Sequence, residues 1–71
     1  MDHERITYLE NEAHYHLTEL IKSAEFIRNT VGTGTPNYGS AANLGMHAAR
    51  ASATVMAVSE LKRDAMRRGE K

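Results

Sequence analysis

Eight residues in the middle of the chain cannot continue a helix or a strand, and they divide the sequence into two near-equal halves. Residues 32–39 read Gly-Thr-Gly-Thr-Pro-Asn-Tyr-Gly and contain three glycines and the chain's only proline. Glycine and proline at this density mark a connector. The Gly-Thr-Gly-Thr run partly resembles a phosphate-binding loop, but it lacks the Gly-Lys-Ser/Thr ending of such loops. We therefore interpret the segment as a plain connector.

The first half has helical periodicity and predicts one helix over about residues 3–31. Asp2 is the expected N-cap, and Gly32 suits the left-handed position that follows a helix. Glu4 in the first turn and Arg28 near the end both complement the helix dipole. Spacings of three and four between apolar residues are typical of one buried helical face. The residues that follow this spacing are Ile6, Leu9, Ala13, Leu17, Leu20, Ala24, Ile27 and Val31.

The second half predicts another helix over about residues 40–68. Ser40 is the expected N-cap, and Gly69 provides a stop just after two arginines in the last turn. Two helices joined by a short connector predict an all-α antiparallel hairpin. The whole chain, residues 1–71, is then a single helical-hairpin domain.

The distribution of charge favours the same antiparallel pairing. Residues 1–31 carry six acids and three bases, whereas residues 32–71 carry three acids and six bases. An antiparallel hairpin brings the acidic start of the first helix near the basic end of the second. We expect Asp2 and Glu4 to lie near the arginines there, which are Arg63, Arg67 and Arg68.

Composition indicates that one hairpin is too small to bury a sufficient core. Isoleucine, leucine, valine and phenylalanine together number 12 of 71 residues, and the net charge is zero. Small residues surround much of the second helix, which predicts burial on several sides and hence self-association. A two-fold four-helix bundle is the simplest assembly, and a larger ring of hairpins is the next. We expect the interface to include Gly45, Ala49, Ala53 and Met56.

One polar line runs along the second helix: Asn43, His47, Arg50 and Thr54. These residues are spaced by four, three and four, so they share one face. Arg50 in a segment expected to be buried needs a partner, because an unpaired buried charge is costly. That partner is either an acid of the first helix, Glu12 or Glu19, across the hairpin or across a subunit boundary, or an anionic ligand. In the second case Tyr15 or Tyr38 would stack on a base of the ligand.

A stripe of aromatic and charged residues lies beside the apolar face of the first helix: Tyr8, Glu12, Tyr15, Glu19, Lys22 and Phe26. Aromatic side chains with a polar tip favour protein interfaces. Tyr8, Tyr15 and Phe26 predict either a second self-association surface or the docking site of a target protein. The sequence leaves these two alternatives open.

The sequence predicts neither a metal site nor an enzyme. His14 and His16 point in different directions on a helix, although each shares a face with a glutamate. The second helix offers only His47 and a distant Glu60, so we expect no metal and no cofactor. The chain contains no cysteine, no Ser/His/Asp set and no paired carboxylates beside a credible pocket. We therefore expect no catalytic residues.

Charge and hydropathy argue against two further classes of partner, nucleic acids and membranes. A C-terminal basic cluster alternates with acids, which argues against nucleic-acid binding because phosphate contacts favour a strongly basic face. The cluster comprises Lys62, Arg63, Arg67, Arg68 and Lys71. No apolar run is long enough for a membrane span or a signal peptide. We expect a cytoplasmic protein without a membrane partner.

Two features also carry a resemblance to a known family. A polar first helix ends in a loop containing Pro36, and the second helix holds Ala53-Thr54-Val55-Met56-Ala57-Val58 followed by Arg63. Over about residues 12–63 the chain resembles the helical hairpin of phage sponges that sequester cyclic nucleotide signals of CBASS and Thoeris defence. The resemblance implies an oligomer that binds cyclic di- or trinucleotides without cleaving them.

The sequence therefore predicts a non-enzymatic, oligomeric binding protein. The first hypothesis is a phage-encoded antagonist of bacterial defence that sequesters a cyclic nucleotide. The alternative is a small helical adaptor or inhibitor that binds a host protein through the aromatic stripe on its first helix.

Overall fold

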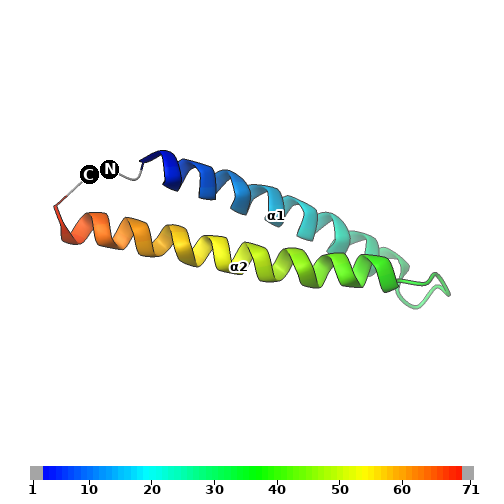
Figure 1. Ribbon diagram of the computed structural model, residues 1–71. Helices are drawn as coiled ribbons and strands as arrows, with labels where there is room; N and C mark the ends of the chain where they lie inside the picture. The colour runs from blue at the N-terminus through cyan, green and yellow to red at the C-terminus, as the bar shows by residue number, and fades with distance from the viewer. Residues whose placement is uncertain (1–2, 70–71) are drawn as a thin grey trace.

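The computed structural model describes residues 3–69, which form two α-helices and the turns beside them. Helix α1 spans His3–Thr30 and helix α2 spans Tyr38–Arg67. The helices run antiparallel and side by side along almost their whole length, so the molecule is a rod of 55 × 16 × 14 Å (Figure 1). The predicted all-α two-helix hairpin is confirmed. No helix within residues 3–69 is both long enough and apolar enough to cross a membrane.

The connector begins and ends earlier than the sequence predicts, because α1 ends at Thr30 and α2 starts at Tyr38 and not after Ser40. Asn37 occupies the N-cap position, but its side chain makes no capping bond. Its Nδ2 atom instead donates a hydrogen bond of 2.8 Å to Thr30 Oγ1 at the end of α1. The prediction of Ser40 as N-cap is wrong. The Asn37 side chain therefore makes no capping bond to α2 and instead links the start of α2 to the end of α1.

Glycines end both helices as predicted. Gly32 has φ +86° and Gly69 has φ +76°, and this left-handed region is accessible mainly to glycine. The amide of Gly69 also donates to the carbonyl of Met66, which closes the last turn of α2. The expected N-cap of α1, Asp2, lies outside the described residues.

Two of the three arginines expected near Asp2 and Glu4 pair within their own helix. Arg63 bonds to Glu60 at 2.8 Å and Arg67 lies 3.7 Å from Asp64. Between the described parts of the two helices, an ion pair joins Glu10 Oε2 and Lys62 Nζ at 2.7 Å. Acids three residues away on the same helix are immediate neighbours of an arginine, which explains the local pairing. Asp2 lies outside the described residues, so its pairing stays a prediction.

The seam between the helices is narrow and is made mostly of small side chains. Within residues 3–69 the buried apolar side chains are Ala13, Ala51 and Val58. Two histidines, His16 and His47, are buried beside them. One neighbouring helix covers only one face of α2, so the predicted burial of α2 on several sides requires further chains and stays a prediction.

We predict that Ala51→Leu destabilises the hairpin by about 1–3 kcal/mol, because Ala51 is buried in this narrow seam and a larger side chain must push the helices apart. Ala42→Leu is the control on the same helix, since Ala42 is exposed. Urea unfolding followed by circular dichroism measures both variants. Equal stability of the two variants would contradict a close seam at Ala51.

Candidate binding surface beside a buried histidine pair

Two histidines, one from each helix, meet in the middle of the seam. His16 of α1 and His47 of α2 are 6% and 7% exposed, and their Nδ1 atoms lie 2.9 Å apart. Each histidine occupies the helix face that packs on the other helix, in register with the small buried residues. This hydrogen bond is the one polar side-chain contact that spans the buried seam among residues 3–69.

The two rings are arranged for a direct hydrogen bond. Their centres lie 5.1 Å apart, which is close to the nitrogen–nitrogen distance plus one ring radius at each end. The nitrogens therefore lie nearly on the line that joins the ring centres. A metal ion bound to both Nδ1 atoms, at the same Nδ1–Nδ1 distance of 2.9 Å, would bring the ring centres closer together than the observed 5.1 Å. The pair needs one Nδ1–H donor and one unprotonated Nδ1 acceptor.

The acidic neighbours do not extend the histidine pair into a metal centre. Glu12 Oε1 lies 3.9 Å from His16 Nε2, on the far side of the ring from His47. His14 is exposed and lines a separate hollow on another face of the hairpin. In the part of the chain that the structure describes, no three histidine or acidic side chains converge as metal ligands would.

Tyr15 covers the histidine pair from one side. Its ring meets the ring of His16 edge-on at 5.1 Å and that of His47 edge-on at 5.8 Å. The side chain nevertheless stays about half exposed to solvent. Tyr15 and His47, both predicted as ligand-binding residues, are therefore brought together, and part of the tyrosine surface remains open.

Arg50 lies on α2 close to this histidine pair but is exposed, contrary to the expectation of burial. It is one helical turn from His47, and it makes no ion pair with any residue of the range 3–69. The expected partners are engaged elsewhere, since Glu19 binds Lys22 at 3.2 Å. Within one chain Arg50 pairs with neither Glu12 nor Glu19, and a pair across a subunit boundary stays a prediction. A solvated guanidinium needs no protein counter-ion, which is the physical reason.

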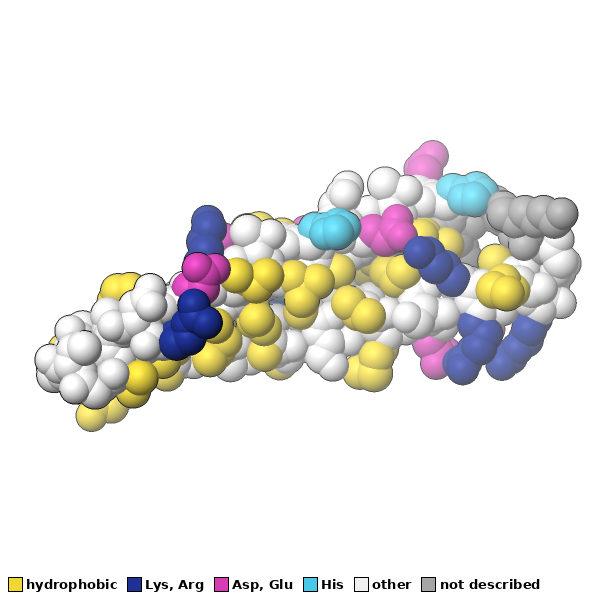
Figure 2. Space-filling view, turned by 180° about the vertical axis from the view of Figure 1, so that it is seen from behind, with side chains coloured by type: hydrophobic (Ala, Val, Ile, Leu, Met, Phe, Trp, Pro, Cys, Tyr) yellow, Lys and Arg dark blue, Asp and Glu magenta, His cyan; other side chains and the backbone are white. Residues whose placement is uncertain are grey.

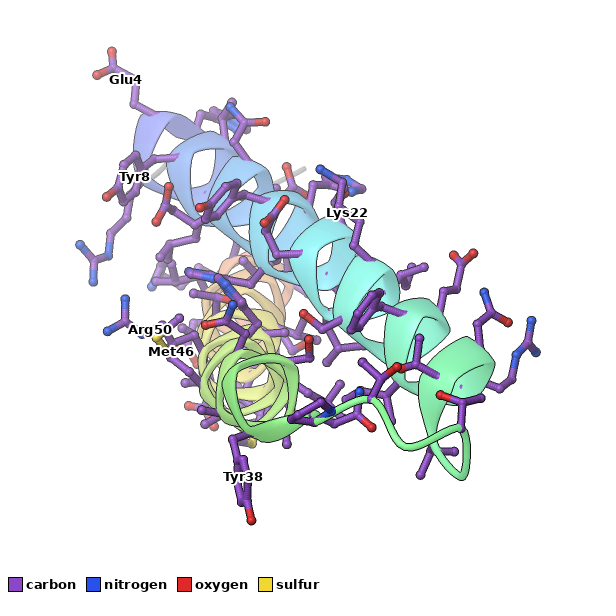
Figure 3. The ribbon with its side chains drawn as sticks, turned by 90° about the vertical axis from the view of Figure 1, so that its right-hand side faces the viewer. Glu4, Tyr8, Lys22, Tyr38, Met46 and Arg50 are labelled. Atoms are coloured by element: carbon purple, nitrogen blue, oxygen red, sulfur yellow. The ribbon has the colours of Figure 1, made fainter. Side chains whose placement is uncertain are left out.

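The other predicted ligand residues differ in position. Asn43 is exposed one turn before His47, whereas Thr54 donates its hydroxyl to the carbonyl of Arg50 at 2.8 Å. Tyr38 is 89% exposed and begins α2, twelve residues from Arg50, which is about 18 Å along a helix. In Figure 3 Arg50 and Tyr8 extend to the same side of the hairpin, while Tyr38 points away from both. Tyr38 is therefore not part of the surface around Tyr15.

The residues predicted for protein contact are all exposed in the hairpin, in two groups. Tyr8, Tyr15 and Phe26 share one flank of α1 by their spacing of seven and eleven residues, and Tyr8 extends to the same side as Arg50 (Figure 3). The α2 group lies on the outer face of that helix, away from α1, as its spacing of four, four and three dictates. This group comprises Gly45, Ala49, Ala53 and Met56.

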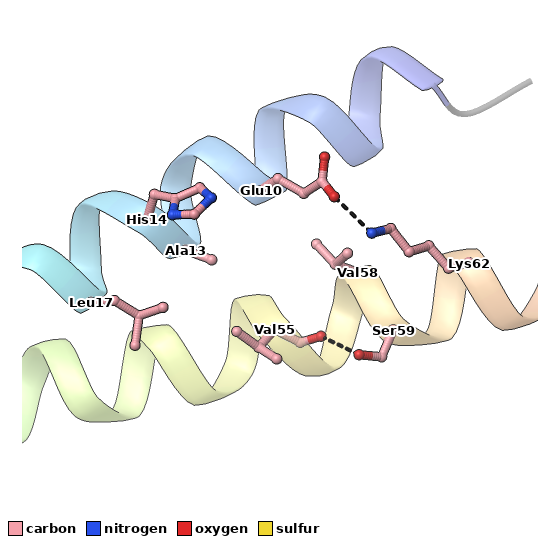
Figure 4. A pocket seen from close by; sticks show the side chains of 8 residues that line it. All are labelled: Glu10, Ala13, His14, Leu17, Val55, Val58, Ser59 and Lys62. Atoms are coloured by element: carbon pink, nitrogen blue, oxygen red, sulfur yellow. Dashed lines mark hydrogen bonds and ion pairs between the residues drawn. The ribbon is translucent and has the colours of Figure 1, made fainter.

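Sequence reasoning missed a hollow on the opposite side of the hairpin. Ala13 and Leu17 of α1 and Val55 and Val58 of α2 line it from opposite helices (Figure 4). Its volume is about 270 Å³, and the Glu10–Lys62 ion pair lies at its rim. The apolar spacing of each helix was visible in the sequence. Which flanks of the two helices meet depends on the rotation of one helix against the other, which spacing alone does not give.

Most of the C-terminal basic cluster is neutralised. Lys62 binds Glu10, Arg63 binds Glu60 and Arg67 lies beside Asp64, so three bases already have acidic partners. Lys71 lies outside the described residues. Paired bases present little net positive charge to a phosphate backbone.

Comparisons of this chain with protein-family models, with curated proteins and with solved structures found no match.

We predict that His16→Leu and His47→Leu each destabilise the hairpin by about 1–3 kcal/mol, because each leaves the other imidazole buried without its partner. The double variant should lose about 1 kcal/mol less unfolding free energy than the sum of the losses in the two single variants, since it removes both polar groups. Urea unfolding at one fixed protein concentration measures the four proteins.

His3→Leu is the control for this cycle, because His3 is exposed at the start of α1. Its stability should stay within about 0.5 kcal/mol of the unmodified chain. Strictly additive costs for His16→Leu and His47→Leu would contradict a direct bond between the two rings.

Proposed function

We propose that this chain is a non-enzymatic binding protein that acts as a self-associated bundle of hairpins and sequesters an anionic nucleotide. The site comprises Tyr15, Arg50 and Asn43, which lie around the buried His47. The observation that carries the proposal is the exposed Arg50, which has no ion-pair partner within residues 3–69 and lies one turn from a histidine that Tyr15 covers. A guanidinium binds phosphate oxygens, and an exposed aromatic ring stacks on a base.

Self-association is supported by the small core of the single hairpin. Of the residues in the range 3–69, three apolar side chains are buried, whereas eleven large apolar side chains between Tyr8 and Met66 are exposed. An isolated pair of helices with so little buried apolar surface gains little stability to offset the entropy lost on folding. Further hairpins packed on these side chains would supply the missing burial.

The resemblance to phage sponges of CBASS and Thoeris defence suggests which nucleotides to test. Such a protein holds a cyclic di- or trinucleotide signal in the cytoplasm and keeps it from its receptor, and it needs no catalytic group to do so. The donors available at the site also fit this role, because Arg50 and Asn43 can contact phosphate oxygens without activating water.

We predict saturable binding in isothermal titration calorimetry with a panel of cyclic di-AMP, cyclic di-GMP and cyclic tri-AMP. Arg50→Ala should weaken the binding about tenfold or more, because it removes a charge-assisted hydrogen bond. Arg63→Ala is the matched control, since Arg63 is already paired with Glu60, and it should bind like the unmodified chain. No heat with any of the three nucleotides would refute the nucleotide proposal.

A second candidate function, the protein-binding adaptor, is favoured by one observation. Tyr8, Tyr15 and Phe26 are all about half exposed or more on one flank of α1. Binding of a purified host protein should then persist in Arg50→Ala and be lost in Phe26→Ala, because Phe26 belongs to the aromatic stripe alone. The reverse pattern would remove the adaptor proposal.

A further inference from the structure

One side of the hairpin carries an apolar band, which we call the groove face. It is formed by Leu17 and Ile21 of α1 and Val55 of α2, around the hollow between the helices. Leu17 and Val55 line the hollow directly, and Ile21 follows Leu17 by one helical turn. Figure 2 shows this side, where hydrophobic side chains run along the middle of the molecule.

The polar side chains on this face are few, and the charged ones stand in opposite pairs. Glu10, His14 and Lys62 also line the hollow, and Glu10 and Lys62 form an ion pair and cancel each other. Figure 2 shows acidic and basic side chains close together on either side of the central hydrophobic stretch. A surface whose charges are already paired can be buried without leaving an unpaired charge.

The hairpin exposes more surface than a compact protein of its size. Its accessible area is 5289 Å², whereas a compact monomer of this 7.9 kDa mass exposes about 4,400 Å². The excess of about 900 Å² matches the roughly 800 Å² that each partner buries in a standard stable interface. One interface of ordinary size would therefore make this rod as compact as a typical small protein.

A second copy of the chain fits this surface better than an occasional partner does. Because the core is so small, the molecule that packs on the groove face must be present whenever the chain folds. Another copy of the chain meets that requirement. The two helices are also nearly equal in length, 28 and 30 residues, so two hairpins can overlap fully. Four helices of equal length make a closed bundle.

The helix charges select the orientation of that copy. Helix α1 carries five acids and three bases, whereas α2 carries two acids and four bases. A two-fold axis along the rod places each α1 over the α2 of the other copy and so sets acidic helices against basic ones. An axis across the rod would place α1 over α1 and α2 over α2, which sets like charges together.

We propose that two copies pack groove face to groove face about a two-fold axis parallel to the rod, giving a four-helix bundle with both connectors at one end. This inference rests on the self-association in the proposed function and specifies its surface and symmetry. Leu17, Ile21 and Val55 lie in the interface. The flank with Tyr15 and Arg50 stays outside, so the bundle presents two nucleotide-binding surfaces.

A matched pair of substitutions tests the surface by light scattering. Ile21 is 51% exposed and Phe26 is 47% exposed, and both lie on α1 but on different faces. Ile21→Glu should reduce the mass from dimer to monomer, because it buries a carboxylate in the proposed interface. Phe26→Glu should keep the dimer mass, with circular dichroism recording the helix content of both proteins.

Each outcome of this experiment has a distinct meaning. A dimer that persists in Ile21→Glu but dissociates in Phe26→Glu would overturn the groove face and place the contact on the aromatic flank. Equal dissociation of both variants would also overturn the assignment. A monomeric unmodified chain would instead refute self-association itself, and so the proposed function on which this inference rests.

The direction of the axis is tested without disturbing the interface. The chain contains no cysteine, so Tyr38→Cys places one spin label at the highly exposed first residue of α2. The label-to-label distance in the dimer should fall below about 35 Å, because helix axes in a bundle lie only 8–10 Å apart. A distance approaching the 55 Å length of the rod would overturn the proposed axis.

Discussion

The narrow contact between α1 and α2 is the constraint on which the rest of the molecule depends. The most buried part of the seam is built from two alanines, one valine and a hydrogen-bonded histidine pair, whereas leucines such as Leu9, Leu20 and Leu44 are only half-buried. Small side chains let the two helices approach closely, but they bury little apolar area. Leu17 and Ile21 are exposed on a flank of the hairpin.

The histidine pair gives this seam its specificity. A hydrogen bond between two buried rings fixes the rotation and the register of α1 against α2, because any slip would leave both imidazoles unpaired. The same rotation decides what each side of the hairpin presents. One side carries Tyr15 and Arg50, and the other carries the groove face, so a single buried contact positions both proposed surfaces.

The sequence predicted the two helices because their signals are local. Periodic apolar residues, the glycine- and proline-rich connector and the glycine after each helix each act within a few residues, and the structure confirms the hairpin that they imply. The pairing of His16 with His47 could not be predicted in this way. It depends on contacts between residues 31 positions apart, and helical spacing leaves the rotation of one helix against the other undetermined.

The error about Ser40 has a physical cause outside the local sequence. Ser40 was a reasonable cap, but α2 begins two residues earlier, where Asn37 bonds to Thr30 at the end of α1. The exposure of Arg50 in the single chain follows from a helix with one neighbour having only one covered face, and its predicted burial depends on further chains. In both cases contacts beyond the local composition decide the outcome.

The central claim is that the hairpin is stable only when it associates with further copies of itself. Dilution of the unmodified chain, with mass followed by light scattering and helix content by circular dichroism, tests this claim most directly. The account predicts a multiple of 7.9 kDa at high concentration, with helix content falling as the mass falls. A 7.9 kDa species that keeps its full helix content at every concentration would contradict it.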